Sequence, residues 1–259
     1  MNLENNRGIS RNVLKFVAIT TIVIGHFFLY TLTTLNVIQK LNVPWRGMLC
    51  YICFMGPPIF MFFISEGFRY TRSKVSYGKR LLIFALITQV AFAITTQDGL
   101  GFDVKRFFFT WNVFFALLIG FVDLCILNSK QKTLWKVLEV LATLALSYFT
   151  KTEWWVFGPL MVIAFYYLRE QRVLKFVVAT ILTYLTFALS DCDFGGAYQV
   201  TLWTKSMPYI MIYAMIGIAL VSFCYYGKNG KKNKFLQYFF YVFYPLHLIL
   251  IDIVILLAK

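Results

Sequence analysis

Histidine, acidic residues and long polar stretches are all scarce in this chain of 259 residues. It contains two histidines, and Asp and Glu together number 11. Charged residues make up 14% of the chain, whereas hydrophobic residues make up 60%. A soluble domain of this length would need many more polar groups to cover its surface. The composition therefore excludes an ordinary soluble protein, and we expect residues 1–259 to form a single membrane domain.

Cysteine is also sparse and scattered, which argues against a metal site or a disulfide framework. Cys50 and Cys53 form a C-x-x-C sequence, but they lie in an apolar run and no second such pair follows. Buried free cysteines usually pack as small hydrophobic side chains. We therefore expect no metal. The net charge of +14 comes from short basic loops beside apolar segments, so it predicts contact with anionic lipid headgroups and no nucleic acid.

Long apolar runs dominate what remains and predict an all-α, polytopic membrane protein. A membrane-spanning helix needs about 20 apolar residues, although packed helices are often shorter. By this criterion we expect about nine transmembrane helices. The predicted segments are Phe16–Leu35, Gly47–Gly67, Leu81–Thr96, Phe107–Leu127, Leu134–Phe149, Trp154–Leu168, Val173–Leu189, Met207–Tyr226 and Phe235–Ala258.

The distribution of basic residues predicts the orientation. Cytoplasmic loops carry an excess of Lys and Arg. When the nine segments alternate in direction from a cytoplasmic N-terminus, 18 of the 25 basic residues fall in cytoplasmic loops. The opposite orientation would reverse this bias. We therefore predict a cytoplasmic N-terminus and an external C-terminus.

The two histidines are the first candidates for chemistry, because each lies deep inside an apolar segment. His26 lies in the first predicted helix and His247 in the last. Ionisable side chains inside a membrane are costly and often functional, and histidine moves protons readily near neutral pH. Both lie near the middle of the bilayer, on helices that run in the same direction. Each could instead be a structural hydrogen-bond partner between helices.

Other polar features accompany the histidines. Asn112 is predicted at a similar depth, either as a site residue or as a contact between helices. The Gly56-Pro57-Pro58 sequence is predicted to break the second helix near mid-depth, and a broken helix is tolerated beside protein or a wet cavity.

A basic loop at residues 67–80 carries five basic residues and no acid. It is either a topology signal or a phosphate site, since arginine supplies forked donors to phosphate oxygens. Glu66 precedes it and could pair with Arg69 or Arg80. On the opposite side, Asp191 and Asp193 form either a solvated turn or an anionic patch that receives an ammonium group.

Several segments from the first helix to the last resemble the TraX family of bacterial membrane proteins, which is similar in layout to the acyltransferase 3 and heparan-glucosaminide acetyltransferase-like groups. The segments are LKFVAITTIVIGHF, GPPIFMFFISEGFRYTRSKVSYGKRLLIFALITQ, NVFFALLIG, SDCDFGG and FYVFYPLHLILI. The stretch 130–188 contributes little to the resemblance.

The resemblance implies N-acetylation of a pilin amino terminus with acetyl-CoA as the donor. It implies that His26 is the general base, that His247 is a second catalytic or orienting group, and that Asn112 is a polar site residue. The basic residues that it assigns to the coenzyme phosphates are Arg69, Arg72, Lys74, Lys79 and Arg80, with Glu66 to orient them.

Two positions depart from the family pattern. Gly25 stands where the family usually has Asp directly before the first His, and Ala116 stands where it prefers Thr. A general base normally gains its orientation from such a carboxylate. Asp123, another carboxylate or a backbone carbonyl would have to replace it.

From these features we predict an acyltransferase of the bacterial cytoplasmic membrane. Its acceptor is a peptide, glycan or lipid with an amine or hydroxyl group, guided by Asp191 and Asp193. Two alternatives stay open. One is a carrier or channel that uses the histidine pair as a proton relay, and the other is a non-catalytic membrane assembly or immunity protein.

Overall fold

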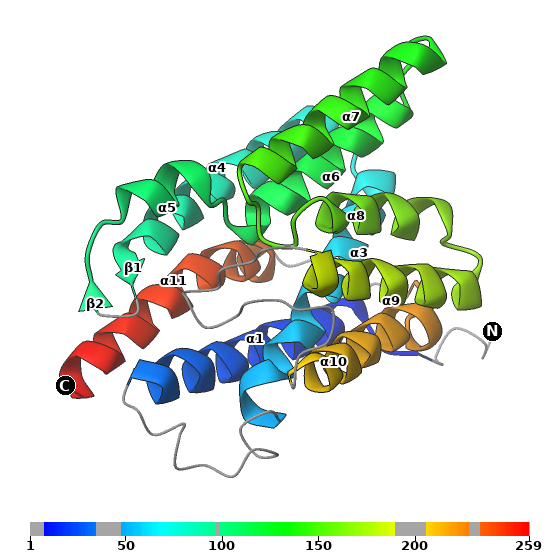
Figure 1. The fold of residues 1–259 in the computed structure, drawn as a ribbon. Coiled ribbons are helices and arrows are strands. Elements are labelled where there is room, and N and C mark those ends of the chain that lie inside the picture. The colour runs from blue at the N-terminus through cyan, green and yellow to red at the C-terminus, as the bar shows by residue number, and fades with distance from the viewer. Residues whose placement is uncertain (1–7, 35–47, 97–98, 190–205, 228–233, 259) are drawn as a thin grey trace.

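A computed structural model describes residues 8–34, 48–96, 99–189, 206–227 and 234–258 of the chain. The described part is helical apart from one very short hairpin (Figure 1). In chain order its elements are α1 (Arg11–Thr34), η3 (Ile52–Met55), α3 (Gly56–Tyr70), α4 (Lys74–Ile94), β1 (Thr95–Thr96), β2 (Gly99–Leu100), α5 (Val104–Phe109), α6 (Val113–Leu127), α7 (Thr133–Phe149), α8 (Phe157–Tyr167), α9 (Arg172–Leu189), α10 (Met207–Ala219), η4 (Leu220–Cys224) and α11 (Lys234–Ala258).

Each of the nine predicted segments contains a helix, which confirms the polytopic all-α fold. Seven helices in the described residues are long and apolar enough to cross a membrane. The other two, α7 with 17 residues and α8 with 11, are shorter. The departure from an all-helical chain is the antiparallel β1–β2 pair, in which Thr95 pairs with Leu100 and Thr96 with Gly99. The orientation in the membrane stays a prediction.

Helix α3 lies at the centre of the bundle. It packs against α1, α6, α8 and α10, and most of its residues are buried. Helices α1 and α11 lie side by side and run in the same direction, as predicted (Figure 1). This pairing brings the first and last of the described helices together.

The second predicted helix is broken, as its Gly-Pro-Pro sequence indicates. A helical stretch at residues 48–51 is followed by the 3₁₀ turn η3, and α3 then begins with Pro57 and Pro58 in its first turn, where proline is tolerated. Two glycines let neighbouring helices approach this turn. A Cβ added at Gly25 of α1 would lie 2.5 Å from Cys53 Cβ, and one at Gly217 of α10 would lie 2.3 Å from Met55 O.

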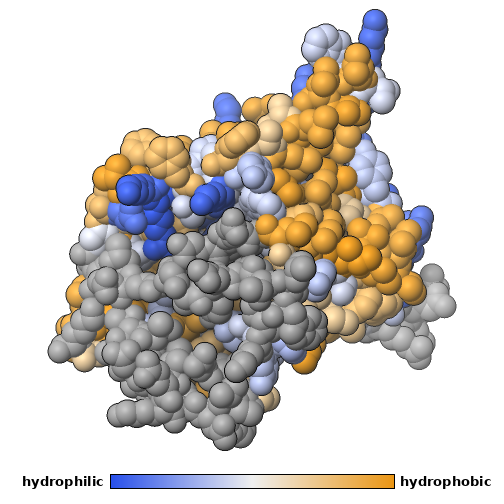
Figure 2. All heavy atoms as spheres, in the orientation of Figure 1, coloured by the Kyte–Doolittle hydropathy of each residue, from blue (hydrophilic) through white to orange (hydrophobic). Residues whose placement is uncertain are grey.

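The surface supports the membrane assignment. Helix α7 packs on α6, and among its residues only Ser147 is buried. Figure 2 shows apolar side chains over this part of the molecule, with hydrophilic ones at the tip of the α6–α7 hairpin. Leu134, Leu141 and Phe149 are among the exposed side chains of α7. Such a face is stable in lipid and would be costly in water.

Candidate functional site

The two histidines meet at the contact between α1 and α11. His26 Nδ1 lies 3.0 Å from His247 Nε2, although the residues are 221 positions apart in the chain. Their rings are nearly parallel, with centroids 5.2 Å apart and an interplanar angle of 19°. His247 is buried, whereas His26 is partly exposed. The predicted convergence of the two rings is thus present in the structure.

The hydrogen bonds of His247 determine the tautomer of both rings. His247 Nδ1 lies 3.3 Å from the backbone carbonyl oxygen of Phe243. A carbonyl oxygen accepts but does not donate, so Nδ1 of neutral His247 carries the hydrogen and its Nε2 carries the lone pair. That lone pair accepts the N–H of His26 Nδ1. The lone pair of His26 is therefore at its Nε2, the position from which a base takes a proton.

A cavity of about 710 Å³ connects this pair to a basic end of the bundle. The volume is within the usual range for small-molecule sites. At the histidine end the cavity is lined by residues from α1, η3 and α11 and by the loop before α8. At the basic end it is lined by Arg11 and Lys15 of α1, Arg72 of the α3–α4 turn, and Arg80 of α4.

Glu153 is a carboxylate at the histidine end that the sequence analysis did not select. It lines the cavity with both histidines. Its Oε2 accepts the backbone N–H of Val113 at 2.6 Å and the hydroxyl of Tyr244 at 3.3 Å. Val113 is the first residue of α6, so Glu153 lies at a helix N-terminus, where backbone N–H groups stabilise an anion. The Tyr244 ring in turn lies 5.1 Å from the His247 ring.

Burial and hydrogen bonding act in opposite directions on Glu153. Burial raises the pKa of the Glu153 carboxyl above its ordinary value. The Val113 N–H, the charge of Arg106 and the Tyr244 hydroxyl act to lower this pKa and so favour the carboxylate form.

An unusual loop places Glu153 in the cavity. Lys151, Trp154 and Trp155 have φ values of 42°, 65° and 46°, a region that non-glycine residues rarely occupy. Backbone hydrogen bonds tie the loop to the start of α6, with Glu153 N donating to Trp111 O at 2.8 Å and Trp111 N donating to Thr150 O at 3.1 Å. Strained backbone of this kind persists where the surrounding structure over-determines it and is frequent at functional sites.

Asn112 supports the contact between the Glu153 loop and the start of α6. It is not among the described residues that line the cavity. Its side chain is buried and caps α6, because its Oδ1 accepts the N–H of Phe114 at 2.9 Å. Its Nδ2 donates to Gln89 Oε1 at 2.7 Å and to Ala85 O at 3.0 Å. The structure therefore places Asn112 between α4 and α6, directly before the N–H group that holds Glu153.

The basic end contains part of the predicted phosphate set and two residues that were not predicted. Arg72 is exposed and Arg80 partly buried, and both line the cavity. Arg11 and Lys15, which are among the 18 basic residues predicted to be cytoplasmic, also line the cavity. Lys15 Nζ lies 5.4 Å and 5.2 Å from the ring centroids of Phe63 and Phe240, respectively.

Three predicted basic residues lie elsewhere. Lys74 donates to the backbone carbonyl of Phe68 and its Nζ lies 3.7 Å from the Phe68 ring centroid. Arg69 and Lys79 are exposed. In the part of the chain that the structure describes, none of these three lines the cavity.

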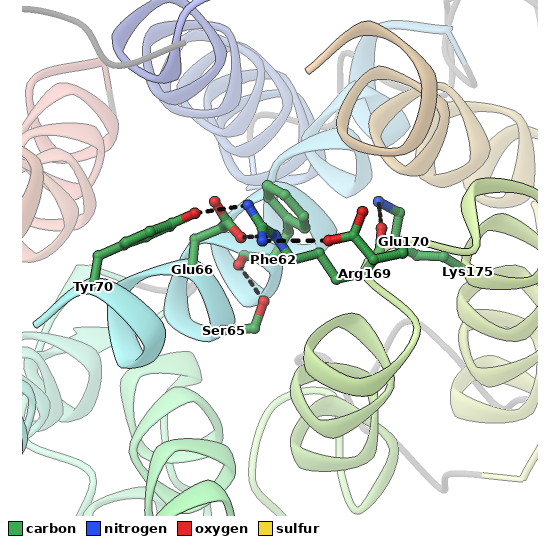
Figure 3. Close-up of polar contacts among 7 residues, drawn as sticks. All are labelled: Phe62, Ser65, Glu66, Tyr70, Arg169, Glu170 and Lys175. Carbon is green, nitrogen blue, oxygen red and sulfur yellow. Dashed lines mark hydrogen bonds and ion pairs between the residues drawn. The ribbon is translucent and has the colours of Figure 1, made fainter. Parts of the chain in front are cut away.

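Glu66 pairs with Arg169, so the predicted pairing with Arg69 or Arg80 is wrong. Its Oε1 lies 3.0 Å from Nε of Arg169, in the turn between α8 and α9, and the same guanidinium donates from Nη2 to the Tyr70 hydroxyl at 2.7 Å (Figure 3). Burial acts to lower the pKa of Arg169, but Glu66, Tyr70 and Glu170 together outweigh it and the pKa is raised. Glu66 and Tyr70 both line the cavity, so this ion pair forms part of its basic end.

Asp123, which could have replaced the missing Asp beside His26, lies away from the histidines. Asp123 accepts the Thr143 hydroxyl at 2.5 Å between α6 and α7 and is not among the described residues that line the cavity. Asp191 and Asp193 lie outside the described residues. Among the residues that the structure describes, no group of three or more His, Cys, Asp or Glu side chains is arranged to hold a metal ion.

Comparisons with known proteins show the family to which the chain belongs. Over 258 residues, the chain is 26% identical to a protein described as "Probable fimbrial assembly protein FimC, serogroup H1" from Dichelobacter nodosus, an alignment that covers 96% of this chain and 97% of the relative. No solved structure matches it significantly. The family described as "TraX protein" matches residues 10–255, a range that includes both histidines, Glu153 and the basic end. This multi-pass membrane protein therefore belongs to the TraX family.

Proposed function

We propose that this protein is an integral-membrane acyltransferase that uses acetyl-CoA as its donor. One observation carries the proposal. A histidine with an available Nε2 lone pair lines a cavity whose other end presents four basic side chains. A proton acceptor and an anion-binding entrance are the two features that transfer from a phosphorylated thioester requires.

The basic end is suited to the phosphates of coenzyme A. Arginine binds phosphate oxygens through paired N–H donors, and lysine adds a compact positive charge. Arg72 and Arg80 provide the arginines on one side of the entrance, and Arg11 and Lys15 lie on the α1 side. The flexible pantetheine arm would then extend through the cavity toward His26.

At the histidine end the reaction is a direct transfer. The acceptor nitrogen or oxygen attacks the thioester carbonyl carbon while His26 Nε2 takes the acceptor's proton. The new C–N or C–O bond forms, the C–S bond breaks, and the coenzyme thiolate leaves and recovers the proton from His26. The products are the acylated acceptor and free coenzyme A, so atoms and charge balance. Base catalysis of this kind is typically worth about 10²–10⁴-fold in rate.

The developing negative charge on the carbonyl oxygen needs a hydrogen-bond donor. Tyr30 lines the cavity one turn beyond His26, and its ring centroid lies 5.5 Å from that of His26. We assign this role to the Tyr30 hydroxyl, because the Asn112 amide hydrogens are already bonded to Gln89 and Ala85.

The acceptor is proposed from the family and the relative together. The TraX resemblance implies acetylation of a pilin amino terminus, and the Dichelobacter nodosus relative is named as a probable fimbrial assembly protein. We therefore propose a secreted or pilin-like peptide amine as the acceptor, in the bacterial cytoplasmic membrane. Asp191 and Asp193 remain the predicted contact for its ammonium group.

Labelled acetyl-CoA tests the proposal. Purified protein in lipid nanodiscs is incubated with [¹⁴C]acetyl-CoA and a panel of peptide, glycan and lipid acceptors, with His26→Gln as the matched variant. We expect label transfer by the native protein and loss of transfer in the variant at equal expression. Equal transfer by both proteins would disprove the role of His26, and no transfer to any acceptor would disprove the enzyme.

A non-catalytic assembly factor is the second candidate, and the name of the relative favours it. Such a protein would bind a pilin-like partner without consuming acetyl-CoA. A carrier that uses the histidine pair as a relay would instead show solute or proton flux in sealed vesicles, so the same preparation separates all three functions.

A further inference from the structure

Neither histidine has an acidic neighbour in the sequence, so the protonated pair lacks a counter-charge next to it in the chain. Gly25 precedes His26, and Leu246 and Leu248 flank His247. When His26 takes a proton, the hydrogen-bonded pair becomes positively charged inside an apolar bundle. An isolated charge in such surroundings is strongly disfavoured unless an opposite charge lies nearby.

Gly25 itself cannot be replaced by an acid without moving the bundle. A side chain at this position would begin 2.5 Å from Cys53 Cβ and 2.6 Å from Cys53 N. The close packing of α1 on η3 thus disfavours a carboxylate at position 25, and α1 contains no Asp or Glu at any other position. The compensating charge must therefore come from another element.

We propose that Glu153 is the positioning residue that supplies this negative charge to the His26–His247 pair through Tyr244. This inference rests on the proposed function for its role in catalysis. The Val113 N–H at 2.6 Å and the α6 N-terminus favour the ionised form of Glu153. Tyr244 links the two groups, because its hydroxyl donates to Glu153 and its ring lies 5.1 Å from His247, three residues further along α11.

The surroundings of Glu153 contain few competing charges. Arg106 is the basic side chain that influences both Glu153 and Tyr30, and Asp252 is the other nearby acid. The titratable groups around Glu153 are His26 and Tyr30 from α1, Cys53 from η3, Arg106 from α5, and Tyr244, His247 and Asp252 from α11. Of the two acids, Glu153 is the one that lines the cavity with both histidines.

The design of the fold around Glu153 supports the assignment. The loop that carries it contains three non-glycine residues at positive φ and is tied to α6 by two backbone hydrogen bonds. Asn112, fully buried and bonded at every polar atom of its side chain, fixes the helix end that receives Glu153. These contacts fix the Glu153 carboxylate at the histidine end of the cavity.

Selective labelling gives a direct test, because the chain contains two histidines. Protein labelled with ¹⁵N only at the histidine rings is titrated in nanodiscs, and the ring nitrogen shifts report protonation of the pair. In Glu153→Gln, which keeps an acceptor for the Val113 N–H but removes the charge, we expect the titration midpoint to fall by about one pH unit. Glu153→Asp should keep most of the native midpoint, and Tyr244→Phe should lower it by less than Glu153→Gln does.

Asp123→Asn is the matched control, because Asp123 is also buried but lies away from the cavity, and it should leave the midpoint unchanged. An unchanged midpoint in Glu153→Gln, or a larger shift in Asp252→Asn, would overturn the proposal. The acid limb of the pH–rate profile should move to lower pH together with the midpoint. A midpoint that shifts in a protein without transfer activity would refute the proposed function and retain the role of Glu153, so the two failures are distinguishable.

Discussion

The two ends of the cavity hold their polar side chains in different ways. At the histidine end His26, His247, Tyr244 and Glu153 are connected to one another or to backbone groups by hydrogen bonds. At the basic end, the ion pairs found among the described residues both belong to Arg169, while Arg11, Lys15, Arg72 and Arg80 take no part in them.

This difference suggests that the two ends of the cavity have different functions. Preorganised groups suit a reacting centre, where small displacements are costly in rate. Basic side chains without acidic partners suit the capture of a charged ligand, because their charge is not already neutralised. Changes at the two ends should therefore affect different kinetic constants.

Removal of the proposed base, His26, should have the largest effect on the rate of transfer. His26→Gln keeps a polar side chain but cannot take a proton, so we expect kcat for acetyl transfer to fall by about 10²–10⁴-fold. Binding of acetyl-CoA, measured by equilibrium dialysis, should change little, because the basic end is untouched. A large loss of binding with kcat retained would contradict the division between the two ends.

Removal of both arginines at the basic end should affect KM for acetyl-CoA. In the Arg72→Gln, Arg80→Gln double variant we expect KM for acetyl-CoA to rise by about 10- to 100-fold with kcat nearly unchanged. A charge-assisted hydrogen bond contributes about 1.5–3 kcal/mol, and solvent screening reduces this contribution at the exposed Arg72. Lys79→Gln, at an exposed position on the same helix as Arg80, is the control and should leave KM unaltered. An equal rise in KM for both proteins would remove the case for a phosphate site here.

Packing beside His26 can be tested through stability. Gly25→Ala forces a Cβ against Cys53, and overpacking of this kind typically costs about 1–3 kcal/mol. We expect a lower Tm in detergent or nanodiscs. Gly78→Ala is the comparison, because its new Cβ would meet a ring atom of Phe121 at 3.2 Å, a side chain that can shift. Equal Tm values for the two variants would show that α1 can move away from η3.

Added salt should produce the smallest effect and should act on KM through the basic end of the cavity. Raising the ionic strength from about 0.01 M to 0.15 M shortens the screening length from about 30 Å to 8 Å. We expect KM for acetyl-CoA to rise severalfold, because Arg72 is exposed, whereas kcat should be constant because the histidine pair lies away from the basic end. Initial-rate assays at saturating and limiting donor separate the constants, and a salt-dependent kcat would argue against a reacting centre at the histidine end.

The fold and the histidine pair were accessible from the sequence for simple physical reasons. Long apolar runs can satisfy their backbone hydrogen bonds only as helices in lipid, so each of the nine segments was visible. An ionisable ring within such a run is rare, and His26 and His247 could be selected without knowledge of any contact.

Glu153 could not be found in the same way. It lies in a short polar stretch between two apolar segments, where an acid usually indicates a solvated loop. The direction of the Glu153 side chain into the cavity depends on positive φ values at Lys151, Trp154 and Trp155. None of these residues is a glycine, so the sequence does not indicate the turn. The Glu66–Arg169 pair was missed because its members are far apart in sequence, whereas nearby Arg69 and Arg80 offered a local alternative. Asn112 was predicted as a site residue or as a contact between helices, and sequence could not distinguish these two roles; the structure shows the contact and a helix cap.

The contact between α1 and α11 also affects how the protein is made. His26 emerges from the ribosome with α1, and His247 emerges only with α11, 221 residues later. A nascent chain that has not yet made α11 would have an unoriented imidazole and an open flank where α11 packs. The two rings can therefore meet only after α11 has been synthesised.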